Sequence, residues 1–567
     1  MSDEFQVSGN NAAALFTLKV HRGDGMALLA MNWKKNQPPQ DFVGFGIEYK
    51  EPGGKKFFPL RNRLTFAGAP SGDDDALSTL RSPIQKFRWV HFPRNANLEG
   101  DFIYRVTPLF MDAQDKISPG KIQEVAIELR RETYPGKLNV TFTRGFVSSQ
   151  AFVDRYEKAG PIETLVCPKA AGGLTFVATH PKRKEALAWM GFEAREEILT
   201  LLDEAIEDKN AKVRVVAYDL NEPEVVSRLV KLGERLKVII DDSADHGKGR
   251  SAENMAAKML TASAGKNNVK RQHMRNLQHN KTIVVDGPKV KKAVCGSTNL
   301  SWRGLYVQAN NAIVLQGEKP VSLFMAAFED YWTQTAFNAT KSAALTSLGL
   351  DGIDAQVAFS PHSTANTMLQ KIADDLETKT TSSLLYSLAF LSQTPGAILD
   401  AIEKVSNDDD IFVYGIADKE VGGLDLQTPD GFKVPVFASA LGKDAPAPFS
   451  KEPIGGGGTR MHHKFLVIDF DKPTARVYMG SYNFSVAADG SNGENLLLIR
   501  DRRIAVSYMI EALRIFDHYH FRIAWAKAKK KNERLELAKP PRKPGEKPWW
   551  DKDYTDPRRI KDRALFA

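Results

Sequence analysis

Cysteine is almost absent from this sequence, whose 567 residues contain only Cys167 and Cys295. The two are far apart and outside any C-x-x-C pattern, so neither a disulfide framework nor a zinc site is indicated. Long apolar runs are also missing, and no stretch approaches the roughly 20 residues of a membrane-spanning helix. The first residues, MSDEFQVSGNN, lack the basic and apolar regions of a secretion signal. We therefore expect a cytoplasmic protein without a transmembrane segment.

A strong excess of positive charge is missing from most of the chain. The net charge is +9, but residues 527–567 carry 14 Lys and Arg against 7 Asp and Glu, which leaves only +2 for the remainder. A nucleic-acid enzyme with a broad basic face usually carries more. The length predicts two to four domains, and a hydrophobic content of 42% with 26% charged residues is typical of globular proteins.

One pattern is present twice. HNKTIVVD begins at residue 279 and HHKFLVID at residue 462, and both read H-x-K-x4-D with a G-S-x-N turn about ten residues beyond the aspartate. Corresponding residues are 183 or 184 positions apart. The shared positions are His279, Lys281, Asp286, Ser297 and Asn299 in the first copy and His462, Lys464, Asp469, Ser481 and Asn483 in the second. Such a repeat indicates a duplicated catalytic half.

The spacing fits a phosphate site. Each motif contains a β-branched, apolar strand, on which side chains two positions apart share a face, so histidine and lysine line one surface. A hairpin would return each G-S-x-N turn beside its histidine, where amide and hydroxyl groups form an anion cradle. Two imidazoles can act as nucleophile and as acid and base, while lysines stabilise the phosphoryl oxygens. Because no carboxylate cluster for a divalent ion accompanies these groups, we expect neither metal nor cofactor.

These paired motifs resemble the two HKD motifs of the phospholipase D superfamily. The resemblance implies that His279 is the nucleophile and that His462 is the acid and base, although the sequence itself leaves that order open. It also implies a set of phosphate-binding residues, namely Lys281, Asn299, Lys464 and Asn483, with Ser297 and Ser481 in less certain roles. Asp286 and Asp469 are expected to be buried supports that orient the structure or pair with the partner histidine.

The expected architecture is α/β, with two repeated halves preceded by a β-sandwich. Residues 1–145 contain alternating segments such as FVGFGIEYK, KFRWVHFP, FIYRVTPLF and VAIEL, separated by turns, which favours an antiparallel sandwich. Trp89 and the VTP at residues 106–108 resemble a fibronectin type III module. Without a catalytic cluster, this domain is expected to serve as a spacer or docking module.

The catalytic halves are predicted at residues 146–345 and 346–530. In the first, EALAWMGF, VRVVAYDL and KVIIDD read as strands separated by amphipathic helices, so a mostly parallel sheet with helices on its faces is expected. SSLLYSLAFLS and DIFVYGIAD are aligned with the first two of these strands, and one active site is placed at the seam. Residues 434–460, ending in four glycines, suggest a mobile flap. His273 is more simply an exposed residue than a catalytic one.

Residues 531–567 form a basic tail that contains prolines and the pair Trp549 and Trp550. The tryptophans could stack on bases or lie at an anionic membrane surface, or the tail could pack back on the body with both buried. The predicted function is a phosphodiesterase that hydrolyses phospholipids or exchanges their head groups. A metal-independent nuclease is the alternative, and a catalytically dead binding protein is a third reading.

Overall fold

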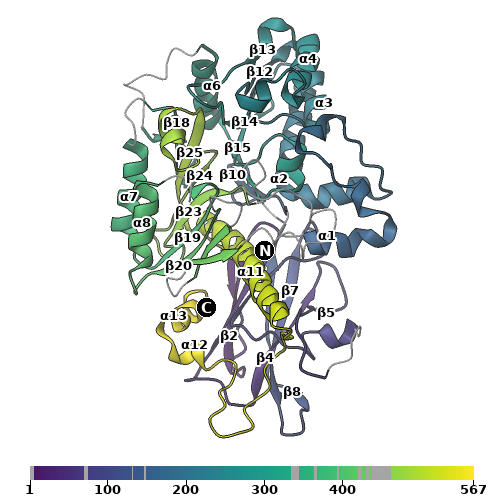
Figure 1. Ribbon diagram of the computed structural model, residues 1–567, viewed down its shortest axis with the longest axis vertical. Helices are drawn as coiled ribbons and strands as arrows, with labels where there is room; N and C mark the ends of the chain where they lie inside the picture. Colours follow the sequence, from purple (N-terminus) through teal and green to yellow (C-terminus); the bar gives the residue numbers. More distant parts are fainter. Residues whose placement is uncertain are drawn as a thin grey trace. The chain divides into compact units, whose positions relative to one another are not determined.

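The computed structural model describes residues 5–68, 74–130, 132–145, 149–333, 344–362, 367–391, 395–418, 424–428, 433–436 and 461–567. The chain divides into two units, traced in Figure 1. The first unit comprises Met1–Arg131, Pro429–Phe432 and Val506–Ala567, and the second comprises Glu132–Thr428 and Lys433–Ala505. Among the described residues, no helix combines the length and apolarity that crossing a membrane requires.

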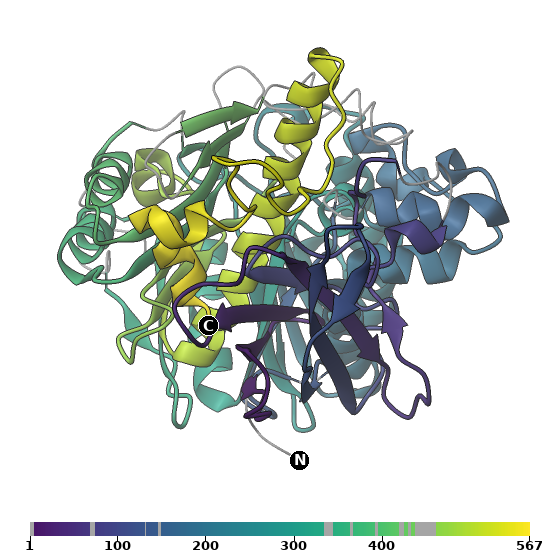
Figure 2. The same ribbon diagram turned by 90° about the horizontal axis from the view of Figure 1, so that it is seen from below.

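The first unit contains two antiparallel sheets, which confirms the β-sandwich. One has the order β1 (Gln6–Ser8), β2 (Phe16–Arg22), β3 (Ala27–Trp33), β6 (Arg88–His91). The other has the order β5 (Phe58–Pro59), β4 (Phe42–Lys50), β7 (Asp101–Met111), β8 (Ile117–Pro119), with β9 (Gln123–Glu128) paired to β7. Inward side chains of both sheets, among them Phe16, Phe45 and Tyr104, form one buried cluster. The purple and blue strands are seen from below in Figure 2.

The C-terminal tail belongs to the same unit as this sandwich. Helix α11 (Arg502–Lys530) leads into it, and it ends in the short helices α12 (Lys552–Thr555) and α13 (Pro557–Leu565). Trp550 is buried in the sandwich core. The ring of Trp549 stacks on Phe87 at 5.3 Å, and its indole N–H donates to the carbonyl of Phe42. Of the two readings of the tail, the structure supports packing on the body, and residues 531–567 fall within the first unit.

The second unit contains two large mixed sheets, which confirms the α/β class. The first has the order β10 (Leu138–Phe142), β16 (Asn311–Gln316), β15 (Lys291–Gly296), β14 (Lys281–Asp286), β11 (Lys212–Ala217), β12 (Leu236–Ile240), β13 (Val269–Arg271). Its helices are α1 (Ser149–Tyr156), α2 (Arg183–Glu207), α3 (Pro223–Leu232), α4 (Ala252–Ala264), α5 (Trp302–Tyr306) and α6 (Glu318–Thr333).

Two predictions about the first half differ from the structure. EALAWMGF, expected to be a strand, lies inside α2, where Glu, Ala, Leu and Met favour a helix and Phe192, with φ 44°, marks a kink. The strand at that edge is instead β10, which pairs antiparallel with β16. β10 lies within residues 1–145, which the sequence assigns to the sandwich, but it belongs to the second unit, which begins at Glu132.

The second sheet has the order β17 (Thr346–Ser347), β18 (Asp354–Ser360), β25 (Glu494–Arg500), β24 (Arg476–Gly480), β23 (Lys464–Ile468), β19 (Ser383–Leu388), β20 (Phe412–Asp418), β21 (Leu424–Gln427), β22 (Lys433–Val436). Its helices include α7 (Thr367–Lys379), α8 (Ala397–Ser406) and α10 (Val486–Gly490), and α7 and α8 lie side by side in Figure 1. The flap predicted at residues 434–460 lies, beyond residue 436, outside the described residues.

The two sheets repeat the same pairing pattern. β14 lies between β15 and β11, and β23 lies between β24 and β19, while β11 and β19 each pair in parallel with the next strand of the chain. SSLLYSLAFLS, which forms β19, therefore corresponds to VRVVAYDL, and DIFVYGIAD, which forms β20, corresponds to KVIIDD. The sequence-based alignment pairs SSLLYSLAFLS with EALAWMGF and DIFVYGIAD with VRVVAYDL. It is therefore shifted by one strand, because EALAWMGF is part of a helix and not a strand.

Candidate active site

The two halves meet along a seam beside both motifs. Gln278 forms a β-bridge with Gly493, and Ala309 forms one with Met461. Each motif histidine directly follows a bridging residue, at the start of β14 or β23. The seam therefore brings the two copies of the motif together in one buried cluster, in which His279, Lys281, His462 and Lys464 are each no more than 5% exposed.

The first motif histidine is held by a carboxylate from the other half. His279 Nδ1 lies 2.8 Å from Oε2 of Glu494, which is fully buried at the start of β25. Burial lowers the pKa of His279, against the opposing effect of Glu494. A neutral imidazole that donates from Nδ1 to the carboxylate keeps the lone pair on Nε2, which is the arrangement a nucleophile requires.

The second motif histidine has a neutral partner in the equivalent place. His462 Nδ1 lies 2.8 Å from Oδ1 of Asn310 and 3.2 Å from the carbonyl of Ser297. Burial, followed by the nearby charge of Lys464, lowers the pKa of His462 well below its usual value. The pseudo-twofold site is thus asymmetric, because Glu494 in one half is replaced by Asn310 in the other.

The two motif lysines face the same cluster. Lys281 Nζ donates to the carbonyl of His279 at 2.5 Å, and Lys464 Nζ donates to that of His462 at 2.8 Å. Burial lowers the pKa of Lys281 to about 8 and that of Lys464 well below its usual range. An anion placed between them would favour their charged forms.

The G-S-x-N turns have a specific backbone requirement. Gly296 and Gly480 have φ of 141° and 148°, and a Cβ at either would lie within 2.4 Å of the carbonyl oxygen of the neighbouring strand. Both serine hydroxyls are bound to the start of the neighbouring strand, since Ser297 Oγ donates to the amide oxygen of Asn310 and Ser481 Oγ accepts from the backbone N–H of Asn495. Their geometry supports a positioning role for the serines.

The motif asparagines lie at the ends of these turns. Asn299 is 3% exposed, and its Oδ1 and the Oδ1 of Asn483 are buried without a hydrogen-bond partner within the described part of the chain. The amide nitrogen of Asn299 donates to Oδ2 of Asp219 at 2.7 Å. Asparagine side chains with unused polar atoms are suited to binding a ligand between the halves.

The motif aspartates are not partners of the histidines. Asp286 lies at the far end of β14, is about one-third exposed, and forms an ion pair with Lys291. Asp469 is fully buried and accepts hydrogen bonds from the backbone N–H groups of residues 381–383. Of the two aspartates, only Asp469 is a buried support, as expected for both. The residues that pair with the histidines are Glu494 and Asn310 instead of the aspartates.

Sequence reasoning missed Glu494 and Asn310, although a signal was present. Each lies 11 positions after the asparagine of its own turn, at the start of the repeated strands NAIVLQ and NLLLIR. It also missed a polar group at the ends of β11 and β12. His246 bridges Asp241 at 2.8 Å and Asp219 at 3.0 Å. His273, by contrast, is exposed as expected and pairs with Asp242.

Ligand atoms of Asp219, His246 and Glu253 lie within 4.8 Å of one another, a spacing that a metal ion could use. Both imidazole nitrogens of His246 are already within hydrogen-bond distance of carboxylates. Although burial opposes it, these bonds raise the pKa of His246 to about 10. A protonated imidazole between two carboxylates therefore accounts for the cluster.

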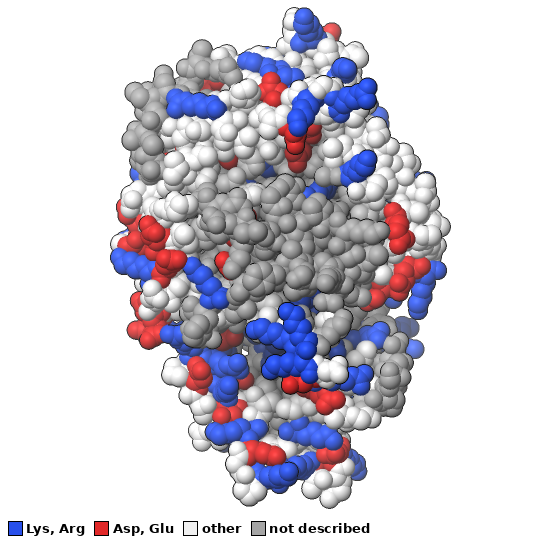
Figure 3. All heavy atoms as spheres, in the orientation of Figure 1, with Lys and Arg blue, Asp and Glu red and all other residues white. Residues whose placement is uncertain are grey.

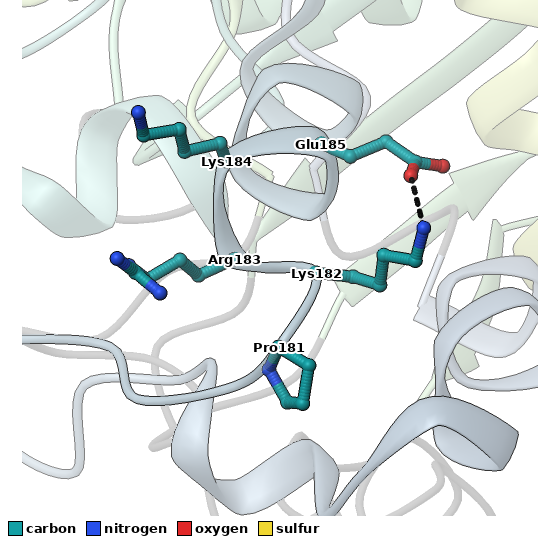
Figure 4. A pocket seen from close by; sticks show the side chains of 5 residues that line it. All are labelled: Pro181, Lys182, Arg183, Lys184 and Glu185. Atoms are coloured by element: carbon teal, nitrogen blue, oxygen red, sulfur yellow. Dashed lines mark ion pairs between the residues drawn. The ribbon is translucent and has the colours of Figure 1, made fainter.

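A shallow surface pocket lies at the start of α2, shown in Figure 4. It is lined by Pro181, Lys182, Arg183, Lys184 and Glu185. Lys182 and Glu185 form an ion pair at 3.8 Å. The pocket shares no residue with the histidine and lysine cluster.

A protein-family model and several named proteins match parts of this chain. A family model described as the phospholipase D-like domain of cardiolipin synthase matches residues 198–332 and 433–516, which include both motifs. Proteins named phospholipase D from Rickettsia prowazekii and Rickettsia typhi are each 48% identical over 48 residues. Each match covers 8% of this chain and 22% of the relative. The chain thus spans about a fifth of the length of these relatives.

The solved structures that match this chain include two bacterial proteins. A phospholipase D family member from Salmonella typhimurium is 25% identical, with 25% of this chain and 88% of that chain covered and a TM-score of 0.20. A phosphatidylserine synthase from Haemophilus influenzae is 13% identical, with 60% and 92% covered and a TM-score of 0.41.

Proposed function

We propose that this chain, which carries a phospholipase D-like domain, is a phosphodiesterase that works through a covalent phosphohistidine. The observation that supports the proposal most is the pair of buried imidazoles at one seam, each oriented by a residue of the other half. Two orientable imidazoles beside two lysines match the requirements of a two-step displacement at phosphorus.

In the first step, Nε2 of His279 attacks phosphorus and forms a P–N bond while the P–O bond to the leaving alcohol breaks. His462 donates a proton from Nε2 to the departing oxygen. Because phosphorylation makes the imidazole of His279 cationic, the carboxylate of Glu494 stabilises the intermediate, which an amide could not do as well. The partner residues therefore favour His279 as the nucleophile.

In the second step, His462 removes a proton from water or from an acceptor alcohol, whose oxygen displaces His279 from phosphorus. Lys281 and Lys464 stabilise the non-bridging oxygens in both steps. The low pKa of His462 is caused in part by the lysine charges. A bound phosphodiester anion offsets these charges, so we expect His462 to hold its proton in the substrate complex.

We propose a phospholipid as the substrate. The description of the family model names cardiolipin synthase, a phospholipid enzyme, and the matched relatives are named phospholipase D. Outside residues 527–567 the net charge is only +2. On the face in Figure 3, basic and acidic side chains are interspersed over the described surface. An enzyme that binds a polynucleotide is expected to carry positive charge over a broader part of its surface.

The test is to offer purified protein mixed liposomes, single-stranded DNA, duplex DNA and RNA in parallel, with His462→Ala as the blank. We expect release of a head-group alcohol that disappears in the blank. Cleaved polynucleotide with intact lipid would favour the nuclease alternative instead. Failure to cleave any of these phosphodiesters would favour a binding protein without catalysis.

A further inference from the structure

The two halves differ beside the phosphate site. Ala217 on β11 lies opposite Lys281, and Leu388 on β19 lies opposite Lys464. Two residues beyond these equivalent positions, the first half has Asp219 and the second half has Phe390. The carboxylate of Asp219 therefore does not belong to the set of phosphate-site residues that is repeated in both halves.

Asp219 lies directly against the phosphate-binding group of its own half. Its Oδ2 accepts from the buried amide of Asn299 at 2.7 Å and from the hydroxyl of Ser301 at 3.5 Å, and its Oδ1 accepts from His246 at 3.0 Å. About a quarter of its side chain is exposed, whereas the motif residues around it are almost fully buried. A carboxylate can accept about four hydrogen bonds, so Asp219 keeps an acceptor site for a ligand.

The charge of Asp219 has a consequence for the substrate. Burial opposes ionisation of Asp219, but the hydrogen bond and charge of His246, together with the nearby Lys281 and His279, outweigh it and lower the pKa of Asp219. An ionised carboxylate next to an anion site repels a phosphodiester, unless the diester itself carries a positive charge near that carboxylate. The unpartnered Oδ1 of Asn299, at 3% exposure, is a second acceptor in the same place.

We propose that Asp219, together with Asn299, binds a primary ammonium group on one alcohol substituent of the phosphodiester, so that the preferred substrate is a zwitterionic amino-alcohol ester. The inference rests on the proposed function and specifies the substrate class of the same site. An ammonium has three donors, which the free acceptor sites of Asp219 and Asn299 can receive. Phe390 offers no such acceptor in the second half.

The test compares two short-chain diesters that differ in one group. Dihexanoyl phosphatidylethanolamine carries a 2-aminoethyl ester, and its n-propyl ester analogue replaces the ammonium by a methyl group of similar size. We expect kcat/KM to be at least about tenfold higher for the amine, as one charge-assisted hydrogen bond predicts. In Asp219→Asn this ratio should fall toward one, and in Asp219→Glu most of it should remain.

A matched control is Asp242→Asn, which removes a negative charge close by in the sequence from a residue that pairs with His273. It should keep the wild-type ratio. A wild-type ratio near one, or an unchanged ratio in Asp219→Asn, would overturn the inference. If the ratio disappeared in EDTA and returned with a divalent ion, the cluster would be a metal site and the inference would be wrong. Failure of His279→Ala to abolish cleavage of the n-propyl ester would instead contradict the proposed function.

Discussion

At the scale of single residues, the site is a duplicated set in which the residues that orient the two histidines have diverged. Glu494 and Asn310 make the same contact to a histidine of the opposite half, at the same 2.8 Å. The histidines, lysines and asparagines could be predicted from the sequence because their spacing repeats. Their partners also lie at repeated positions, but which histidine each one contacts could not be predicted, since the contacts cross the seam, 215 residues apart for His279 and Glu494.

Replacing Glu494 by Gln should lower kcat by about a hundredfold or more, because the cationic phosphohistidine loses its counter-charge. The measurement is pre-steady-state release of a chromogenic alcohol, which should show slower formation of the intermediate. The matched control is Asn310→Ala, which removes the partner of His462. It should lower the rate of the first step less than Glu494→Gln does, because the chromogenic alcohol leaves without needing a proton. Equal kinetics for Glu494→Gln and wild type would remove Glu494 from the mechanism.

The pH dependence follows from Lys281, whose pKa of about 8 is lowered by burial. Since the ammonium is needed for the phosphate, kcat/KM should fall as the pH rises above about 8 and the free enzyme loses this proton. Lys281→Arg, which stays charged, should shift the alkaline decline upward in whatever activity it retains. An unchanged alkaline limb in this variant would assign the decline to another group.

At the scale of elements, the strands were predictable wherever their sequence was both apolar and β-branched. VRVVAYDL and KVIIDD became strands, whereas EALAWMGF became part of α2 because its residues favour a helix. The sequence misplaced β10 because the strand lies close to the sandwich in the chain but pairs with β16, about 170 residues later. Pairing of such distant segments leaves no local pattern.

The two motif aspartates end corresponding strands but should differ in their effect on stability. Asp469→Ala leaves several backbone N–H groups without their acceptor in a buried place and should cost about 3 kcal/mol of the free energy of unfolding. Asp286→Ala removes only an ion pair whose side chains are each about one-third exposed, and it should cost less than about 1 kcal/mol. Urea unfolding of the two variants measures the difference, and equal losses would contradict these roles.

At the scale of the whole molecule, the two units are not successive along the chain. The first combines the N-terminal sandwich with the C-terminal tail, while both motifs belong to the second. Composition marked residues 531–567 as a basic, proline-containing tail. It could not show where Trp549 and Trp550 lie, because burial depends on a sandwich core more than 400 residues earlier.

Trp550→Ala should lower the free energy of unfolding of the first unit by about 3 to 5 kcal/mol, as expected for a large buried ring. Trp525→Ala, at 40% exposure on α11, is the matched control and should cost far less. Thermal unfolding followed by circular dichroism measures both. If Trp550→Ala left stability unchanged but weakened vesicle binding, the tryptophan would act at a lipid surface after all.

The most direct test of a phosphohistidine at His279 is to trap it. A p-nitrophenyl diester has a leaving group that needs no proton, so His462→Ala should still complete the first step and then stall before hydrolysis. After an alkaline quench, peptide mapping by mass spectrometry should find one phosphoryl adduct on His279 in this variant and none in His279→Ala. An adduct on His462 in the wild-type protein, or turnover by His279→Ala at the wild-type rate, would contradict the assignment.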